Sequence, residues 1–174
     1  MAIVFETKRL LARELTLKDA EFLYPILSDA ETMRFYPSPY NMEGVQRWIY
    51  RSLESYKKNS FGLWAIILKE SNQFIGQCGI SLQNIDGKIV PEIGYHIHKD
   101  FWNKGYATEA ALGSLNYGFK TLKLGKIYIH TSINNIPAQR IAEKLGMKKQ
   151  FVYDKYLETF KVTWPIVVYS TQNI

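Results

Sequence analysis

The sequence predicts a mixed α/β fold. Segments whose apolar residues recur at helical spacing alternate along the chain with short apolar runs that are typical of strands. Three of those runs, 63–68, 74–82 and 92–98, follow one another with no helix between them, and this order excludes a doubly wound parallel sheet. The 174 residues contain no internal repeat and no linker rich in Gly, Ser or Pro, so we expect a single domain over residues 1–174.

The first part of the chain predicts a strand and two helices. The run RLLAREL predicts a strand at 9–15, and Thr16 is expected to cap a helix that ends near Leu27. The prolines of FYPSPY predict a loop at 35–40, because a residue that precedes proline is disfavoured in helical geometry. A second helix is expected at 43–58, where the apolar residues share one face.

The second and third of the consecutive strands are joined by a turn with a clear signature. Asp86-Gly87 predicts a tight hairpin, because both central positions of such a turn need a positive φ. Side chains of the strand at 92–98 alternate between two faces of the sheet. We expect one face to carry Glu92, Gly94, His96 and His98, and the other to carry Ile93, Tyr95 and Ile97.

The last part of the chain predicts two helices and three strands. The apolar residues expected to turn inward from a helix at 106–122 are Ala111, Leu112, Leu115, Phe119 and Leu122. Gly146 is expected to end the second helix. The remaining elements are expected at 126–133 (strand), 136–145 (helix), 148–155 (strand) and 161–169 (strand).

The net charge of +6, from 22 basic and 16 acidic residues, favours an anionic partner. A nucleic acid, an acidic surface and a phosphorylated cofactor all meet that description. The basic residues are scattered along the chain, so a lysine-rich solvated surface explains the charge equally well.

The single cysteine and the short apolar runs together indicate where the protein is located. The single cysteine, Cys78, excludes an internal disulfide framework and the paired ligand spacing of zinc sites. No apolar run approaches the ~20 residues that a bilayer-spanning helix needs, and the segment MAIVFETKRL does not have the composition of a signal peptide. We therefore expect a cytoplasmic protein with no membrane partner.

The segment 92–109 carries the most informative pattern, a strand followed by a short turn and the start of a helix. Unpaired N–H groups and the helix dipole make such a helix start suitable for a phosphate group. Gly105 lets the backbone approach an anion, Ala107 is small, and Thr108 offers a hydroxyl donor. The glycines and lysine of a Walker or Rossmann loop are missing, and a glycine here is also explained as a simple turn residue.

The stretch FWNKGYATEA resembles the pyrophosphate-binding loop of the GNAT acetyltransferases, whose pattern is Arg/Gln-x-x-Gly-x-Gly/Ala. Gly105 and Ala107 match its last two fixed positions, and Trp102 stands where Arg or Gln is usual, as in the ribosomal-protein N-terminal acetyltransferase branch. ETKRLLARELTLKDA and NNIPAQRIAEKLGM resemble the opening strand and helix of that branch and its Asn-x-x-Ser…Glu-Lys-Leu-Gly-Phe/Met segment. The resemblance covers nearly the whole chain and implies the GNAT fold, with a central sheet splayed between its fourth and fifth strands.

The resemblance also implies acetyl-CoA as the acetyl donor. No metal is expected, because His96 and His98 have no Cys, Asp or Glu companions at ligand spacing. Backbone groups of Ile97 and His98 would pair with the pantetheine arm, and Asn135 would lie near it. Asn135 equally fits the N-cap of a helix that has Pro137 in its first turn, and the two roles are compatible. The serine that follows in the family motif is Ala138 here. The residues whose backbone N–H groups would hold the pyrophosphate are Asn103, Lys104, Gly105, Tyr106, Ala107 and Thr108.

Acetylation of an amine requires the neutral amine, so a base is needed at neutral pH. Glu92 is the candidate, since it matches the strand glutamate that serves as base in several family members. A solvated strand-end charge or a lysine ion pair explains the same glutamate, and His96 and His98 are further candidates for the base. Many relatives place a tyrosine acid where this chain has Ala142, so a side-chain acid from that helix is excluded.

The sequence therefore predicts an acetyl-CoA-dependent N-acetyltransferase that acts on a primary amine by direct attack. The branch resemblance favours a peptide or protein N-terminus, and small-molecule amines stay open. The FYPSPY loop with Phe61 and Trp64 offers aromatic surface for an acceptor cleft, but in a chain that is 14% aromatic, core positions explain these residues at least as well. Cys78 is more typical of a core residue than of an acyl-carrying nucleophile. The alternative is a non-catalytic domain that senses acetyl-CoA or binds nucleic acid, which the scattered charge disfavours; a homodimer is left open.

Overall fold

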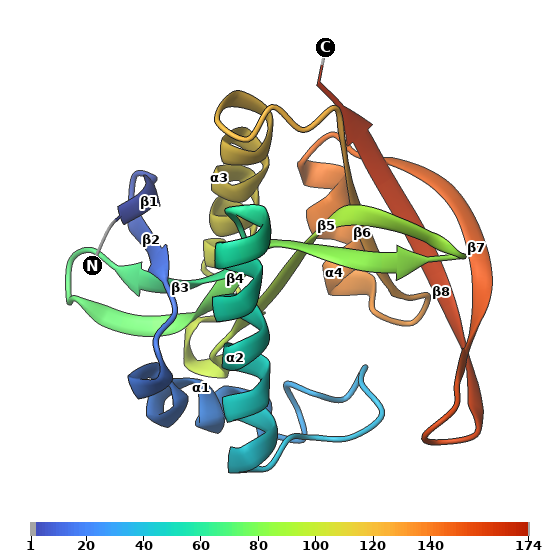
Figure 1. The fold of residues 1–174 in the computed structure, drawn as a ribbon, viewed down its shortest axis with the longest axis horizontal. Helices are drawn as coiled ribbons and strands as arrows, with labels where there is room; N and C mark the ends of the chain where they lie inside the picture. Colours follow the sequence, from blue (N-terminus) through green and yellow to red (C-terminus); the bar gives the residue numbers. More distant parts are fainter. Residues whose placement is uncertain (1–2, 174) are drawn as a thin grey trace.

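The computed structural model describes residues 3–173 as an eight-stranded mixed sheet with helices on both faces (Figure 1). The strand order is β1-β2-β3-β4-β5-β6-β8-β7. The elements are β1 (Ile3–Glu6), β2 (Leu10–Glu14), α1 (Ala20–Leu27), α2 (Met42–Asn59), β3 (Leu63–Leu68), β4 (Gln73–Ile85), β5 (Lys88–Ile97), α3 (Tyr106–Lys120), β6 (Lys126–Ser132), α4 (Ile136–Lys144), β7 (Lys148–Leu157) and β8 (Val162–Gln172). This arrangement confirms the mixed α/β fold.

Strand β3 separates two apolar cores because its side chains alternate between the faces of the sheet. Trp64, Ile66 and Leu68 pack against residues of α3 and α4 in the larger core. The alternate residues of β3 pack on the opposite face, against α1 and α2. All six residues of β3 are buried, which is why the run LWAIIL predicts both ends of this strand correctly.

The hairpin between β4 and β5 confirms the turn signature. Asp86 and Gly87 have φ values of 49° and 81°, and Ile85 pairs with Lys88 on either side of them. Both strands extend to this turn and are longer than the sequence pattern predicts. Strand β1 is not predicted at all, because its four residues form the edge of the sheet and pair only with β2.

Helix α3 confirms the expected burial in part. Ala111 and Leu115 are buried in the larger core, and Phe119 and Leu122 pack at its margin. Leu112 was expected to face inward, but its side chain is exposed and lies with Val4 and Phe5 of β1 along a shallow groove. The small residues Ser114 and Gly118 lie on the buried face instead. The face of α3 that packs on the sheet is therefore the one that carries Ala111, Ser114, Leu115 and Gly118, and Leu112 lies outside it.

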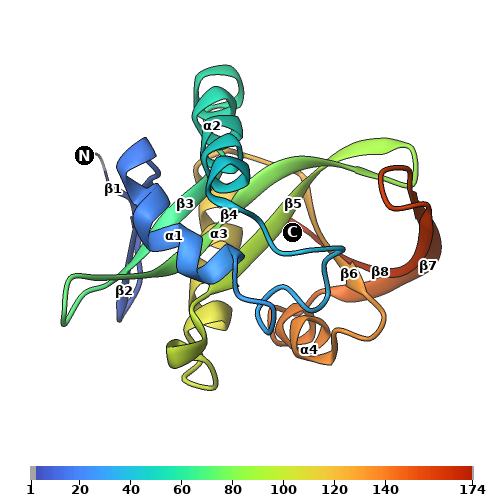
Figure 2. The same ribbon diagram turned by 90° about the horizontal axis from the view of Figure 1, so that it is seen from below.

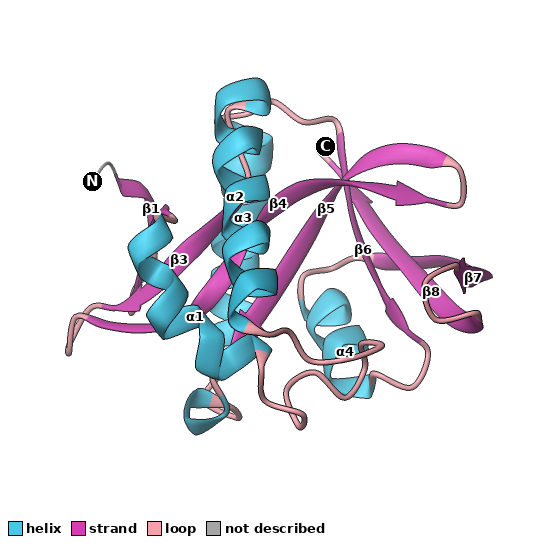
Figure 3. Cartoon of the chain, turned by 60° about the horizontal axis from the view of Figure 1, so that its bottom comes forward, coloured by secondary structure: helices cyan, strands magenta, loops and turns pink. Residues whose placement is uncertain are grey.

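The sheet splits between β5 and β6, which form its parallel pair. Within residues 3–173 these strands are registered only at Glu92 and Tyr128, and beyond that point they diverge toward α4 (Figure 3). Seen from below, the loop between α1 and α2 extends toward α4 across the same region (Figure 2). The split lies between the fourth and fifth of the strands expected from the sequence, as the GNAT fold implies. These strands are labelled β5 and β6 because the additional strand β1 precedes them.

None of the helices within residues 3–173 has the length and apolar composition needed to span a membrane.

Candidate functional site

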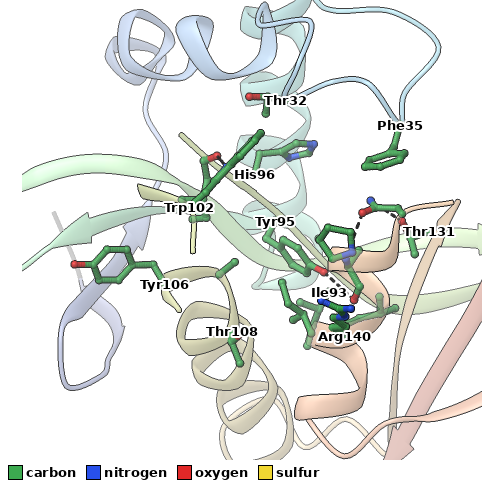
Figure 4. A pocket seen from close by; sticks show the side chains of 18 of the residues that line it. Thr32, Phe35, Ile93, Tyr95, His96, Trp102, Tyr106, Thr108, Thr131 and Arg140 are labelled. Carbon is green, nitrogen blue, oxygen red and sulfur yellow. Dashed lines mark hydrogen bonds between the residues drawn. The ribbon is translucent and has the colours of Figure 1, made fainter. Parts of the chain in front are cut away.

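The split in the sheet opens into a cavity of about 580 Å³. Its walls come from five segments: the loop after α1, strand β5, the turn before α3, strand β6 and helix α4 (Figure 4). The candidate residues from the sequence that line this cavity are Glu92, His96, Ile97, Asn103, Gly105, Tyr106, Ala107, Thr108 and Asn135. His98 and Lys104 do not line it.

The turn before α3 presents free backbone donors to the cavity. Gly105 is the N-cap of α3 and has a φ of 80°, a conformation that L side chains rarely adopt. In the described part of the chain, the N–H groups of Tyr106, Ala107 and Thr108 have no acceptor. Three parallel donors at the positive end of a helix dipole favour an anion at this place.

Arg9, from the turn between β1 and β2, braces this helix start. Its Nε lies 2.6 Å from Oε2 of Glu109, its Nη1 donates to the carbonyl of Lys104 at 2.9 Å, and its guanidinium lies 4.4 Å from the ring centroid of Tyr106. Burial raises the pKa of Glu109, but hydrogen bonds from Thr7 and Arg9 outweigh burial and hold that pKa below its usual value. Glu109 therefore stays charged and holds Arg9 in place.

Trp102, which stands in place of the usual Arg or Gln, bonds the open edge of β5. Its indole Nε1 donates to the carbonyl of Ile97 at 2.7 Å. The expected role of the His98 backbone is wrong, because its N–H donates to Ile75 at 2.8 Å and its carbonyl accepts from Phe101 at 2.9 Å. Alternate residues of a strand direct their backbone groups to opposite edges, so Tyr95 and Ile97 are the ones that face the split.

The carboxylate of Glu92 lies inside the cavity wall rather than in solvent. Glu92 is 7% exposed, and its Oε1 lies 3.3 Å from Nδ1 of His130 on β6. Both alternatives for Glu92, a solvated charge and a lysine ion pair, are therefore wrong. His130 also lines the cavity. His130 is not among the residues predicted from the sequence. It lies two residues after Tyr128, the partner of Glu92 in the β5–β6 register, and therefore shares the Glu92 face of the sheet.

A chain of hydrogen bonds fixes the tautomer of His96. The indole N–H of Trp48, which can only donate, bonds Oε1 of Gln77 at 3.1 Å. The amide nitrogen of Gln77 therefore faces Nδ1 of His96, 3.1 Å away, and donates to it. Burial lowers the pKa of His96 to about 4, so the ring is neutral at pH 7 and carries its proton on Nε2. With Nδ1 engaged, His96 cannot be the base, and the ring of His98 lies outside the cavity.

Asn135 takes the N-cap role and also lines the cavity. Its Oδ1 accepts from the N–H of Ala138 at 3.3 Å, and its Nδ2 donates to Thr131 Oγ1 at 3.0 Å. Ala142 is fully buried in the larger core. The cavity wall at α4 consequently has no acidic hydroxyl at that position.

Three residues weighed as candidates lie in the core. Cys78 is buried with its Sγ 3.4 Å from Ser114 Oγ, and burial raises the pKa of the thiol to about 12, so it is no nucleophile. Phe61 and Trp64 are 7% and 1% exposed in the larger core, so of the two explanations for these residues the core position is confirmed and the acceptor-cleft lining is wrong. Phe35 and Tyr36 of the FYPSPY loop do line the cavity.

The charged side chains that line the cavity include both basic groups, which favour an anionic ligand, and one carboxylate, which can accept a proton. Arg34, Arg140 and Lys144 are its basic lining residues, and Glu92 is the acidic one within the described chain. No cluster of three or more His, Cys, Asp or Glu residues within positions 3–173 is placed to hold a metal ion. The donors present fit a polyphosphate and an extended chain in the split.

Comparison with known proteins identifies this architecture. Residues 9–148 match the family described as acetyltransferase (GNAT) domain. An N-acetyltransferase of Bacillus subtilis, YnaD, which is described as uncharacterized, is 30% identical over 94% of this chain and 94% of its own length. A GNAT-family acetyltransferase structure from Bacillus anthracis covers 98% of both chains at 27% identity, with a TM-score of 0.82. The structure of RimL, titled a ribosomal L7/L12 α-N-protein acetyltransferase in complex with coenzyme A, covers 98% of both chains at 12% identity, with a TM-score of 0.80. The chain belongs to the GNAT family and is an N-acetyltransferase.

Proposed function

We propose that the protein transfers the acetyl group of acetyl-CoA to a primary amine, with a peptide or protein N-terminal amine as the favoured acceptor. One observation carries the proposal. A single cavity joins the free N–H groups at the start of α3 to the buried carboxylate of Glu92, and it lies in the split between β5 and β6. A reaction between a phosphorylated donor and an amine requires a site for the anion and a proton acceptor close together, and this cavity contains both.

The donor end of the cavity is assigned to backbone groups. The N–H groups of residues 103–108 would hold the pyrophosphate, and Arg140 and Lys144 from α4 add positive charge nearby. Backbone groups of Tyr95 and the N–H of Ile97 at the open edge of β5 would pair with the pantetheine arm, beside Asn135, while the carbonyl of Ile97 accepts from Trp102. When bound, acetyl-CoA supplies the activated thioester carbonyl.

The acceptor end is assigned to the face of the sheet that carries Glu92. An aliphatic amine is mostly protonated at neutral pH, so the Glu92 carboxylate promotes reaction by removing a proton, directly or through a group that it touches. Phe35 and Tyr36 form an aromatic wall over this end, which suits a peptide with an apolar side chain near its terminus. The ribosomal-branch motifs and the acceptor named for RimL support a protein N-terminus over a small molecule.

The test is release of coenzyme A in the presence of acetyl-CoA and a panel of amines. The panel contains peptides with free N-termini, the same peptides with acetylated N-termini, polyamines, aminoglycosides and free amino acids. We expect turnover with free peptide N-termini and none with their acetylated counterparts. Turnover only with a small amine would correct the acceptor class, and binding of acetyl-CoA without turnover on any amine would favour the sensing domain.

A further inference from the structure

We propose that His130 is the catalytic residue that moves the proton, with its Nε2 receiving the proton of the acceptor amine and delivering it to the departing sulfur, and that Glu92 positions its ring. This inference rests on the proposed function and deepens it. It assigns a role to a histidine that lies on β6, the strand on the far side of the split from Glu92.

The two side chains are paired within the cavity wall. Nδ1 of His130 lies 3.3 Å from Oε1 of Glu92, and the side chains are only 14% and 10% exposed. The Nδ1–H direction is not aligned on the oxygen in this conformation, so Nδ1 has no hydrogen bond among the described residues. Gly94 lies beside the carboxylate and has no side chain to crowd it: even an added Cβ there would stay 3.6 Å from Oε2 of Glu92.

The other ring nitrogen of His130 is the one available to substrate. Nδ1 is fully buried, whereas Nε2 is not and bonds no group within residues 3–173. His130 lines the cavity, so Nε2 is the exposed end of a carboxylate–imidazole pair. A carboxylate behind Nδ1 favours the tautomer with a free lone pair on Nε2 and stabilises the ring when Nε2 gains a proton.

The remaining titratable groups around this pair cannot take the same part. The Glu92 charge acts on Tyr36 of the loop before α2, Tyr95 of β5, Tyr153 of β7 and Cys78 of β4, and burial raises the pKa of each. They stay neutral near pH 7, as does His96, whose Nδ1 is engaged by Gln77. The basic side chains that α4 adds to the cavity, Arg140 and Lys144, are hydrogen-bond donors with no acceptor.

The proton balance of the step closes on His130. The neutral amine nitrogen forms a bond to the thioester carbon, and the proton that this nitrogen loses passes to Nε2. As the carbon–sulfur bond breaks, the same proton passes from Nε2 to the sulfur. The products are the amide and the free thiol, Glu92 stays ionised throughout, and His130 returns to its neutral form. This route supplies the leaving-group proton that the chain cannot take from a tyrosine at Ala142.

Two variants test the assignment. His130→Ala removes the ring, and we expect kcat to fall about 100-fold or more, with the Kd of acetyl-CoA unchanged. Free imidazole in the buffer should restore at least part of the lost activity, because it can fill the vacated space and carry the proton. His130→Asn keeps an amide near the position of Nδ1 and should fold with the melting temperature of wild type while remaining as slow as His130→Ala.

The pair should also be energetically coupled. Glu92→Gln and His130→Ala together should be no slower than His130→Ala alone, because residues that act as one unit do not lose activity additively. Glu158→Gln, an exposed carboxylate in the turn after β7, is the matched control and should leave kcat unchanged.

A folded His130 variant within about threefold of the wild-type kcat, or strictly additive losses, would overturn the assignment while wild-type turnover still upholds the proposed function. Wild-type protein that binds acetyl-CoA but acetylates no amine would overturn the proposed function and the role of His130 with it. The two failures are distinguished by the wild-type measurement alone.

Discussion

Arg9 and Glu109 are separated by 100 residues and form the ion pair that anchors the first turn of α3, with Nε and Oε2 2.6 Å apart. The same guanidinium holds the carbonyl of Lys104, one residue before Gly105. A side chain from the edge of the sheet thus fixes the turn whose N–H groups face the cavity. N–H groups that are already in place bind an anion without the entropic cost of ordering a loop. We therefore expect the Arg9–Glu109 ion pair to increase the affinity for acetyl-CoA.

Loss of the brace should weaken both the fold and the donor site. Arg9 is 40% exposed as a side chain, so we expect Arg9→Met to cost only about 1 kcal/mol of unfolding free energy. The Kd of acetyl-CoA should rise about threefold to tenfold, because the turn must then be ordered on binding. Thermal melts and calorimetric titration measure the two effects. Arg47→Met, which breaks an exposed pair with Glu43 on α2, is the control and should leave the Kd unchanged.

The glycine at the helix start should be essential for donor binding. Acetyl-CoA that binds only the folded protein raises its melting temperature. Gly105→Val should abolish this shift, because a branched side chain would stand in the path of the pyrophosphate. Gly87→Val is a matched control: its φ of 81° is close to the 80° of Gly105, but it lies in the hairpin of β4 and β5 with no atom within 4 Å of an added Cβ. Both variants carry the same backbone strain, and only Gly105→Val should lose the shift; an equal shift in both would refute the anion site.

The missing hydroxyl of the last helix should matter little. Ala138 lines the cavity beside Asn135, and its N–H is already bonded to that N-cap. Ala138→Ser should therefore leave the Kd of acetyl-CoA unchanged or lower it slightly. The gain in binding free energy should be less than about 1.5 kcal/mol, the net contribution of one hydrogen bond. Isothermal titration gives the comparison. A clear loss of binding would mean that residue 138 does not lie next to the donor.

Local signals in the sequence predicted the parts of this molecule that depend on neighbouring residues. The burial of LWAIIL on both faces fixed β3, and the need for positive φ fixed the turn at Asp86 and Gly87. Gly105 before α3 and the small residues Ala107 and Thr108 in its first turn indicated the free helix start. Each of these features is determined within a few residues of chain.

Contacts across the sheet could not be predicted in the same way. No spacing along the chain relates Arg9 to Glu109 or Glu92 to His130, because strand order and register bring them together. The backbone of His98 was misassigned for a related reason: its N–H continues the ladder to Ile75, and its carbonyl closes the turn to Phe101. The tautomer of His96 depends on Gln77, a residue of the neighbouring strand β4.

The buried ring of His96 should make the fold acid-sensitive. Its pKa is about 4 in the folded protein and 6.5 as an unperturbed side chain, so between these values the unfolded chain binds a proton that the folded protein does not. Its effect on stability is therefore absent above pH 7 and grows as pH falls, reaching about 2 kcal/mol of lost unfolding free energy at pH 5. Denaturant unfolding of wild type and His96→Asn at pH 7 and pH 5 tests this. The variant should lose about 2 kcal/mol less than wild type over that interval, and equal losses in the two proteins would contradict a buried neutral His96.

In the proposed reaction, one cavity binds acetyl-CoA through backbone groups and activates the acceptor amine through Glu92. The most direct test measures kcat and the Kd of acetyl-CoA for Glu92→Gln, which keeps the shape of the side chain and removes its charge, beside Glu158→Gln as control. We predict a kcat about 10- to 1000-fold below wild type at pH 7, a loss that shrinks as pH rises because the amine then needs no base, and an unchanged Kd. A kcat near that of wild type at pH 7 would remove Glu92 from catalysis, and a Kd that rises in proportion to the loss in kcat would mean that Glu92 holds acetyl-CoA instead.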